Sequence, residues 1–283
     1  MMVLVLGGSG DLGAPVAQQL RGDGFQVRLL IRNRGRVPAL DSDFDYAYGD
    51  IDDSASLQSA LAGCDAVHVS VRGGPTAEQF DRIEHRGTAR VAELAAREGV
   101  QRVSYVSHSL AASDAAASDL RAKFHAEQAI AASGVPYTIF RSTYFMETLP
   151  RQIRGRRAVV LGRQRRPFHL LAAADFARMV SRSLSTPEAG GKHLDVHGPQ
   201  AFTIPDALQL YCERVAPGTR VVTMPLWFMT ILDRTVLHGE LRGTLGLMRA
   251  LQESGERGDP TEANRLLGAP SITLAEWCER RTP

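Results

Sequence analysis

The chain has 283 residues, of which 44% are hydrophobic, so it can bury the core of one large domain or of a domain with a small lobe. Its formal net charge of +2 gives no global attraction to nucleic acid or to an anionic membrane, and neither is expected as a partner. The longest apolar stretches are strand-length, far short of the roughly 20 residues that cross a bilayer.

The N-terminal run is typical of a first strand rather than of a signal peptide. Cys64, Cys212 and Cys278 lack the spacing of a disulfide framework or a metal site, so no metal is expected and a reducing, cytoplasmic location is favoured.

The first half of the chain alternates β-branched runs with helical patterns. Helices are predicted at 12–22, around Leu57 and Leu61 with a cap at Asp53 or Ser54, and at 79–98 and 120–132. Six strands are predicted at 3–6, 27–31, 46–48, 66–71, 102–106 and 137–141. Strands that are apolar throughout and alternate with helices indicate a parallel sheet covered on both faces.

The rhythm changes after Arg141. Residues 145–166 read as irregular and arginine-rich, and a helix at 172–184 and a seventh strand at 193–196 follow. Further helical pieces are predicted at 204–215, 224–237, 241–253 and 274–281. We therefore predict an α/β fold with a doubly wound parallel sheet of about seven strands, formed by 1–143 and completed by 171–199. A small, mostly helical lobe, 144–170 and 200–283, is expected over the carboxyl ends of the strands, where ligands bind in such sheets.

A glycine-rich turn joins the first predicted strand to the first helix. Its G-x-x-G-x-x-G spacing, in this context, is typical of a Rossmann-type dinucleotide site. Gly7 permits the sharp turn, Gly10 lets the backbone approach the pyrophosphate, and Gly13 lets the helix pack closely on the sheet. Free N–H groups at the start of the helix then attract the phosphates. The predicted contacts in the turn are Gly7, Ser9, Gly10, Asp11, Leu12 and Gly13.

The end of the second predicted strand distinguishes NADP from NAD. NAD sites place an Asp or Glu here, which accepts a hydrogen bond from the ribose 2′-OH. This chain has Arg32-Asn33-Arg34, without a carboxylate. A guanidinium can bind a 2′-phosphate through two hydrogen bonds and stack on adenine. We therefore expect NADP(H), with Arg32 as a contact; the alternative is that Arg32 is merely solvated.

Other candidate cofactor contacts lie at the ends of the remaining strands. Asp50 follows the third strand and can accept from the adenine amino group, or it only forms a turn. After the sixth strand, the backbone is expected to pass near the nicotinamide carboxamide. The remaining candidates at these strand ends are Ile51, Ser70, Val71, Ser142 and Tyr144.

Several segments together resemble the atypical short-chain dehydrogenases/reductases, and more narrowly the NmrA-like group. They are the turn at 7–13, the strand at 27–33, Gly49-Asp50 ahead of 54–61, Val-Ser-Tyr-Val-Ser at 103–107 and Ser-Gly-Val-Pro-Tyr-Thr-Ile-Phe-Arg at 133–141. The similarity covers about residues 1–200 well and the lobe only loosely. The group contains ether reductases, quinone reductases and regulators that bind the dinucleotide without catalysis. The resemblance therefore implies fold and cofactor more strongly than reaction.

The resemblance also implies a role for Lys123. Standard members of the superfamily carry a proton-transferring Tyr and, four residues later, a Lys that lowers its pKa and binds the nicotinamide ribose. Lys123 matches this lysine, whereas Asp119 occupies the tyrosine position, which puts reduction by a Tyr–Lys pair in doubt. If Lys123 is itself the acid/base, burial is expected to depress its pKa toward neutrality. The alternative is a surface i,i+4 ion pair with Glu127.

Polar residues follow the fifth predicted strand and are expected to edge the nicotinamide pocket. A hydroxyl there can hold a substrate oxygen, and His108 can relay a proton; local hydrogen bonding is the alternative. His125, on the helix of Lys123, faces elsewhere and is interpreted as structural. The catalytic candidates are Lys123, Ser107 and His108, with Ser109 beside them.

Three further segments have a functional and a plainer interpretation. Tyr144, Phe145 and Met146 line a pocket for a planar substrate or pack the lobe onto the sheet. The seven arginines between 151 and 166 suggest an anionic substrate or an acidic partner, but a solvated loop is favoured. The apolar run at 226–231 roofs the active site or packs a lobe or subunit interface, and core packing is favoured.

These observations favour a monomeric or homodimeric NADPH-dependent oxidoreductase. It would transfer hydride to a small conjugated, quinone-like or carbonyl substrate. The alternative is a non-catalytic NADP(H)-binding, redox-sensing regulator, which is consistent with the missing tyrosine. A sugar-nucleotide epimerase is disfavoured, because it normally needs the same tyrosine and a tightly held NAD, against Asp119 and Arg32.

Overall fold

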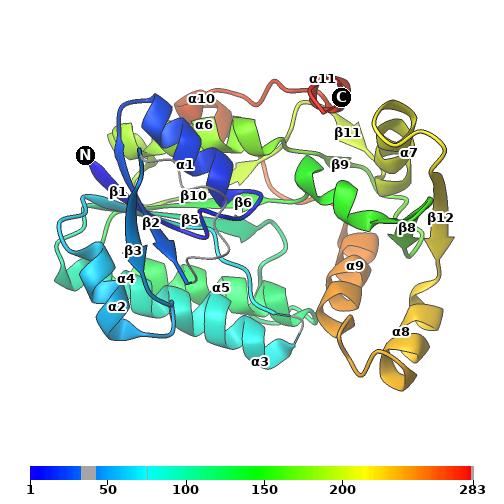
Figure 1. Cartoon of the computed structure of the whole chain (residues 1–283), viewed down its shortest axis with the longest axis horizontal. Helices are drawn as coiled ribbons and strands as arrows, with labels where there is room; N and C mark the ends of the chain where they lie inside the picture. The colour runs from blue at the N-terminus through cyan, green and yellow to red at the C-terminus, as the bar shows by residue number, and fades with distance from the viewer. Residues whose placement is uncertain (33–42, 75, 282–283) are drawn as a thin grey trace.

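The computed structural model describes residues 1–32, 43–74 and 76–281 (Figure 1). Its central sheet has seven strands, all parallel, in the order β10-β6-β5-β4-β1-β2-β3. They are β1 (Met2–Leu6), β2 (Gln26–Ile31), β3 (Asp45–Tyr48), β4 (Ala66–Val69), β5 (Arg102–His108), β6 (Tyr137–Ser142) and β10 (Lys192–Val196). The predicted doubly wound sheet is confirmed. Its order reverses direction between β1 and β4, which is where such sheets bind ligands.

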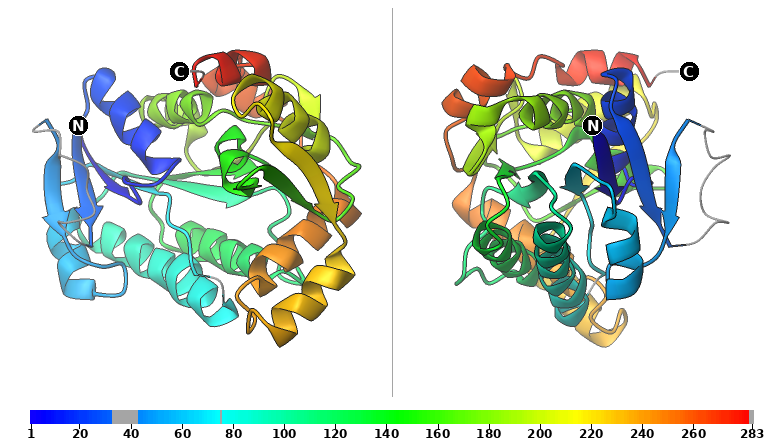
Figure 2. Two further views of the ribbon diagram at one scale, coloured as in Figure 1. Left: turned by 45° about the vertical axis from the view of Figure 1, so that its right-hand side comes forward. Right: turned by 90° about the vertical axis from the view of Figure 1, so that its left-hand side faces the viewer.

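Helices cover both faces of the sheet (Figures 1 and 2). Because successive side chains of a strand point to opposite faces, Val3 and Val5 pack with the first layer, and Leu4 and Leu6 pack with the second. The first layer consists of α1 (Gly13–Gly22), α6 (Ala173–Ser185), the 3-10 turn η5 (Pro187–Ala189) and α10 (Thr261–Leu267). The second consists of α2 (Ser54–Leu61), α4 (Thr88–Arg97) and α5 (Ser118–Ala132).

The helix predicted at 79–98 contains a π-helical segment. It begins as α3 (Ala77–Phe80), continues as η2 (Asp81–Gly87) and ends as α4. Such wide turns inside helices are rare and are frequently found at functional sites. Here the wide turn carries Glu84, whose side chain is buried.

The segment expected to be irregular, 145–166, contains regular structure, so that expectation was wrong. After η3 (Met146–Thr148) and η4 (Pro150–Gln152), β7 (Ile153–Arg154) and β8 (Arg157–Leu161) form an antiparallel hairpin. Side-chain burial alternates along β8, in which Arg157 is exposed while Ala158 and Val160 are buried. The many arginines around this strand had suggested an irregular segment. β8 also pairs with β12 (Arg220–Met224), and β9 (Phe168–His169) pairs with β11 (Ala201–Phe202).

A third apolar core joins these small sheets to the last helices. The helices are α7 (Ile204–Arg214), α9 (Arg242–Ser254) and α11 (Leu274–Glu279), and α8 (Leu226–Thr235) packs on α9 outside this core. The predicted lobe boundaries remain a prediction; within them, α10 packs against α6 and β10 of the central sheet. In the part of the chain that the structure covers, no helix combines the length and the apolar character needed to cross a bilayer.

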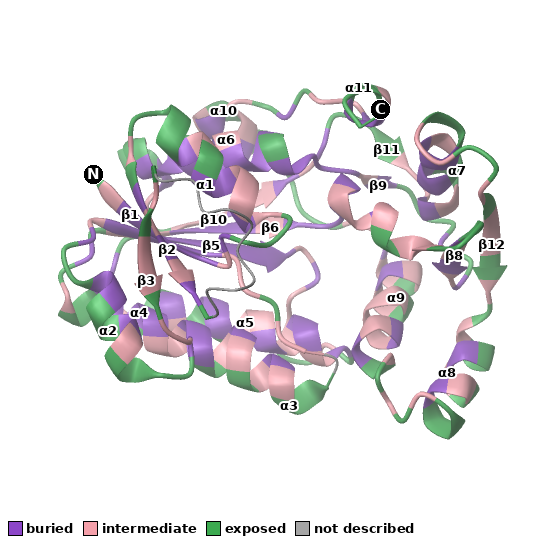
Figure 3. Cartoon of the chain, viewed as in Figure 1, coloured by how far each residue is buried: buried purple, intermediate pink, exposed green. Residues whose placement is uncertain are grey.

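The apolar run at 226–231 was expected to pack in the core, and this expectation was wrong. Trp227, Phe228 and Ile231 are 67%, 41% and 54% exposed, and only Met229 of α8 among the apolar residues of the run is buried. The reason is that α8 lies at the outer end of the molecule and packs mainly on α9 (Figure 3).

Candidate active site

The glycine-rich turn lies where β1 and β4 end side by side, with Leu6 paired to Val69. Gly7 has a φ of 82°, and a Cβ on it would lie 2.1 Å from the Ser70 carbonyl oxygen. A Cβ on Gly13 would lie 2.2 Å from the Gly7 carbonyl oxygen, so Gly13 packs on the turn itself. Both positions therefore need glycine for close backbone contact.

The start of α1 is open toward a ligand. A Cβ on Gly10 would meet only the Gly7 carbonyl oxygen, at 3.2 Å. Leu12 at the N-cap makes no side-chain cap, and the first turn has no acidic residue. The partial positive charge of the helix start is thus not neutralised by its own residues, and this arrangement fits a pyrophosphate.

One side chain of the turn contacts the arginine-rich segment. The Asp11 carboxylate lies 2.5 Å from the Arg151 guanidinium, and both side chains are about half exposed. Without this arginine, the Asp11 charge would repel a phosphate at the same turn. Ser9, also in the turn, is exposed.

The candidates at the adenosine end differ in their surroundings. Arg32 is exposed directly after β2, and Asn33 and Arg34 lie outside the described residues. Asp50 forms a turn, in which its Oδ1 accepts from the Asp52 N–H at 3.0 Å. Ile51 is buried against η2, so only its backbone can face a ligand. Ser70 and Val71 are partly exposed just beyond β4.

Lys123 reaches from α5 to the end of β5. Its Nζ lies 3.0 Å from Glu84 Oε2 and donates to the Val106 carbonyl oxygen at 3.3 Å. Glu84 comes from η2, is 1% exposed, and accepts from the Gly73 N–H at 2.8 Å. The ion pair of Lys123 thus bridges two helical elements beneath the sheet edge.

The surface pair of Lys123 with Glu127 was the wrong alternative. Glu127 is fully buried and is bound by the Arg141 guanidinium of β6 through both carboxylate oxygens. The His193 ring lies 3.6 Å from the same carboxylate. Glu127 therefore pairs with Arg141 of β6, although its i,i+4 spacing on the helix had suggested Lys123 as the partner.

The pKa of Lys123 is raised, against the expectation that it is depressed. Burial lowers this pKa, but the charge and hydrogen bond of Glu84, with a smaller effect of the Asp119 charge, raise it above the usual lysine value. Lys123 is thus held as an ammonium ion. Sequence reasoning missed Glu84, although a carboxylate four residues after Phe80 on the inward face of the predicted helix was a signal.

Asp119 is almost completely buried one turn before Lys123. Its Oδ1 accepts from the Leu120 N–H at 2.9 Å. Burial, followed by the Glu84 charge, raises the pKa of Asp119 to about 6, while the Leu120 N–H and the Lys123 charge oppose this. Both the protonated and the ionised forms therefore exist near neutral pH.

His108 is a neutral hydrogen-bond donor at the end of β5. Its Nδ1 accepts from the Leu110 N–H at 3.0 Å, so the ring proton is on Nε2, and Nε2 is buried without a well-oriented partner among the described residues. Burial and then the Lys123 charge lower its pKa to about 3, although the Thr143 backbone opposes this. At neutral pH, His108 can donate a hydrogen bond but does not carry charge.

Ser107 and Ser109 lie on either side of His108 and differ in bonding. The Ser107 hydroxyl is buried without a partner in the described ranges. It lies on the same face of β5 as Tyr105, toward α5. The Ser109 hydroxyl is 3.0 Å from the Thr143 hydroxyl, which is a local contact.

The side chains that follow β6 pack inside the protein. Tyr144 and Met146 lie in the third core, and the Gln152 amide donates to the Tyr144 hydroxyl. The Phe145 ring packs edge-on against Phe176, with centroids 5.4 Å apart. Of the two interpretations of Tyr144, Phe145 and Met146, packing of the lobe onto the sheet is therefore the one that fits. Tyr144 can reach a cofactor only through its backbone. Ser142, the last residue of β6, is buried as well.

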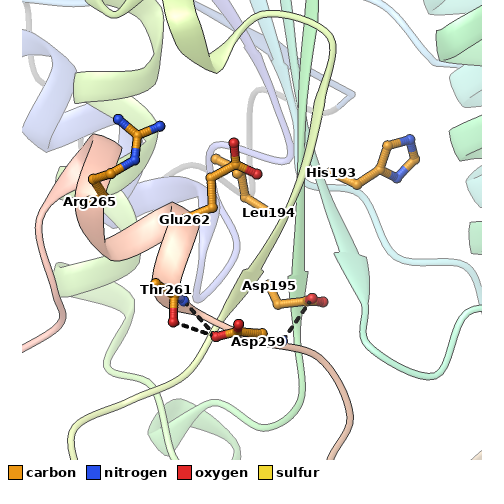
Figure 4. A pocket seen from close by; sticks show the side chains of 7 residues that line it. All are labelled: His193, Leu194, Asp195, Asp259, Thr261, Glu262 and Arg265. Carbon is orange, nitrogen blue, oxygen red and sulfur yellow. Dashed lines mark hydrogen bonds between the residues drawn. The ribbon is translucent and has the colours of Figure 1, made fainter.

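Two surface hollows lie away from the glycine-rich turn. One runs along the outer strand β10 beside α10 (Figure 4). The other lies between β8 and β12 and is lined by Arg156, Arg157 and Arg220. The candidate site itself lies at the carboxyl ends of the neighbouring strands β1, β4, β5 and β6.

Known proteins place the chain in a family. Residues 7–187 match the model of a family described as NAD(P)H-binding. The chain is 31% identical over 292 residues to (4-alkanoyl-5-oxo-2,5-dihydrofuran-3-yl)methyl phosphate reductase of Streptomyces griseus, covering 98% of this chain and 96% of that protein.

Solved structures share the fold. The NADPH-dependent quinone oxidoreductase of Escherichia coli, complexed with NADPH, superposes with a TM-score of 0.76 at 24% identity over 99% of each chain. Triphenylmethane reductase of Citrobacter sp., complexed with NADP(H), gives a TM-score of 0.75 at 19% identity over 99% of each chain. The chain therefore belongs to the NAD(P)H-binding family, in agreement with the resemblance found in its sequence.

Proposed function

We propose that the protein is an NADPH-dependent reductase of a small conjugated, quinone-like or carbonyl molecule bound at the ends of β4, β5 and β6. The observation that carries this proposal is the buried pair of Lys123 and Glu84, 3.0 Å apart, with Asp119 one turn away. Burying charges is costly and seldom stabilises a fold by itself. Shifted pKa values that cluster at a ligand-binding edge are typical of catalytic sites.

Each side chain has a distinct task in this proposal. When bound, NADPH supplies the hydride. The Lys123 ammonium binds the ribose hydroxyls and stabilises the negative charge that develops on the substrate. Asp119 in its protonated form donates the proton that completes the reduction. The Nε2–H of His108 orients the substrate oxygen.

Turnover assays test the reaction. NADPH oxidation is measured with quinones, enones, aldehydes and dyes for the wild type and for Lys123→Met. Loss of one group that stabilises transition-state charge lowers kcat by about 100-fold or more. The chain has only one other lysine, Lys192, which forms a half-exposed pair with Glu262 at 2.8 Å. Lys192→Met is the matched control and is expected to keep wild-type turnover. Unchanged turnover in Lys123→Met would contradict the proposal.

The preference for NADPH rests on Arg32. The exposed guanidinium directly after β2 can bind the 2′-phosphate, and hydrogen bonds to a charged group contribute about 1.5–3 kcal/mol, or roughly 10- to 100-fold in affinity. Arg32→Ala should therefore weaken NADPH binding by that factor and leave NADH binding nearly unchanged in a fluorescence titration. Tighter binding of NADH by the wild type would refute the assignment.

A regulator that binds NADP(H) without catalysis is the second candidate, favoured by Asp119 at the tyrosine position. Tight NADPH binding without turnover on any acceptor would support the regulator. Dependence of turnover on Asp119 would support the reductase.

A further inference from the structure

Three side chains with metal-binding atoms meet away from the candidate active site. His169 ends β9, His197 follows β10, and Glu256 follows α9. One donor atom from each residue lies within 4.8 Å of the other two. The three residues are far apart in the sequence and form no recognisable ligand-spacing motif. For this reason no metal was expected from the sequence.

The hydrogen bond of His197 defines its protonation. Its Nε2 lies 3.2 Å from the Arg257 carbonyl oxygen, which can only accept, so the proton of the neutral ring is on Nε2. Nδ1 therefore presents a lone pair, 4.0 Å from the Glu256 carboxylate. Two electron-pair donors that face each other leave a place for a cation. Metal-binding histidines typically donate their other N–H to a backbone carbonyl in this way.

Glu256 is oriented by the second histidine. Both of its carboxylate oxygens accept from the His169 backbone N–H, at 3.1 and 3.2 Å. Oε2 also lies 2.5 Å from Nδ1 of the His169 ring. The two imidazole rings stack at 5.4 Å with an interplanar angle of 5°. Both rings thus present Nδ1 to one carboxylate.

The segment that follows Glu256 is held against β10 through Asp259 and Asp195 (Figure 4). The Asp259 N–H donates to the Asp195 carboxylate at 3.1 Å, and the Asp259 carboxylate accepts from the Thr261 N–H at 2.9 Å. Gly258 has a φ of 96°, and a Cβ on it would lie 2.2 Å from the Asp195 carboxylate. The position of Glu256 is therefore largely formed before any ion binds.

We propose that His169, His197 and Glu256 form a binding site for a first-row transition metal ion, for which Zn²⁺ is the probe. Two imidazoles and one carboxylate are a ligand set that Zn²⁺ uses, at about 2.0–2.2 Å. Mg²⁺ and Ca²⁺ instead prefer sets made of oxygen. The separations of 2.5 and 4.0 Å from Oε2 to the two Nδ1 atoms need only small side-chain rotations to surround an ion.

Ion binding has two structural consequences. When an ion binds Nδ1 of neutral His169, the ring proton moves through water to Nε2, so the imidazole stays neutral. The site then links the segment after α9 to β9 and β10. His169 is 41% exposed, whereas His197 and Glu256 are 10% and 12% exposed, so the ion enters from the His169 side and keeps a position for water.

The test uses the untagged, full-length protein after treatment with a chelator. Zn²⁺ is titrated in competition with a chromophoric chelator, and one equivalent is expected to bind. His197→Ala and Glu256→Gln should each weaken this binding at least tenfold. The matched control is His85→Ala, because His85 pairs with Asp81 at 2.7 Å on η2, and among the described residues this pair belongs to no group of three ligands close enough to hold an ion. That variant should bind Zn²⁺ like the wild type, and Mg²⁺ should not compete.

A second measurement on the wild type does not depend on the folding of a variant. X-ray absorption of the one-to-one Zn²⁺ complex should show two imidazole ligands. Zn²⁺ should also raise the melting temperature of the wild type but not that of His197→Ala. Absence of a stoichiometric site, equal affinity in His197→Ala, or a spectrum without two imidazoles would overturn the proposal.

Discussion

The glycine-rich turn and the Lys123 cluster lie at the same edge of the sheet but are built differently. The turn is seven consecutive residues, and its geometry depends on the absence of Cβ atoms at Gly7 and Gly13. The cluster combines Glu84 from η2 with Asp119 and Lys123 from α5, and burial decides its charges. A local site is thus sensitive to added atoms, whereas an assembled site is sensitive to the loss of a charge partner.

The largest effect is expected from Lys123→Met, which leaves the Glu84 carboxylate buried and unpaired. Removing one member of a buried ion pair costs about 3–5 kcal/mol. Urea denaturation of the wild type, Lys123→Met, and the double variant with Glu84→Gln measures this cost. The double variant should recover much of the lost stability. Equal destabilisation in both variants would mean that the pair is not coupled, and the comparison would fail.

The next effect separates two glycines of the turn. Gly13→Ala places a methyl group 2.2 Å from backbone and should destabilise the fold by about 1–3 kcal/mol. Gly10→Ala meets only one atom, at 3.2 Å, and should leave stability nearly unchanged. It should weaken NADPH binding, because the added methyl group keeps the pyrophosphate from the backbone of the turn. Thermal unfolding and NADPH titration of both variants check this. Unimpaired NADPH binding in Gly10→Ala would speak against a pyrophosphate at this turn.

Asp119→Asn is expected to change stability with pH. The pKa of Asp119 is about 6 in the fold, above the ordinary aspartate value of 3.8, so wild-type stability falls as pH rises from about 4 through 6. Asn cannot ionise, and the variant should therefore become more stable than the wild type above pH 6, by about 1–3 kcal/mol. Below pH 4 the difference should vanish. Urea midpoints between pH 4 and pH 8 measure it, and parallel curves would exclude the raised pKa.

The pH dependence of turnover is a second test of the role of Asp119. If its protonated form is the proton donor, wild-type kcat decreases as pH rises above about 6, because less of the acid remains. Asp119→Asn should lower kcat and remove this limb of the profile.

The smallest effect is expected from Arg151→Ala, at the contact between the turn and the arginine-rich segment. Both charges are about half exposed, so stability should change by less than about 1 kcal/mol. NADPH affinity should fall more clearly, by about threefold, because Asp11 then repels the phosphates, and high salt should reduce the difference. The double variant with Asp11→Asn should restore the affinity. Failure to restore it would assign Arg151 a role other than compensating Asp11.

Much of the fold was predictable because its signals are local. The strands of the central sheet are short apolar runs bounded by turn residues, and Asp53 caps α2 as one of the two predicted caps. The strand β8 was missed because its short apolar run, 158–161, is flanked on both sides by arginines. The π-helical segment η2 was missed because periodicity does not distinguish one wide turn inside a helix.

The candidate site was predictable only in part, for the same reason. Lys123 was identified through its position, but its partner Glu84 lies 39 residues earlier on another helix. The exposure of Trp227 likewise depends on which elements pack against α8, and the local amino-acid sequence does not reveal this.

The sequence by itself determined the parallel sheet, the glycine-rich turn and the NAD(P)H-binding family. These features depend on side-chain periodicity and on the absence of Cβ atoms over a few consecutive residues. Only the tertiary structure decided that Lys123 pairs with Glu84 rather than Glu127, that Asp119 has a raised pKa, and that His169, His197 and Glu256 meet. Charge partners and burial are properties of residues brought together from distant segments, because electrostatic interactions act through space and not along the chain.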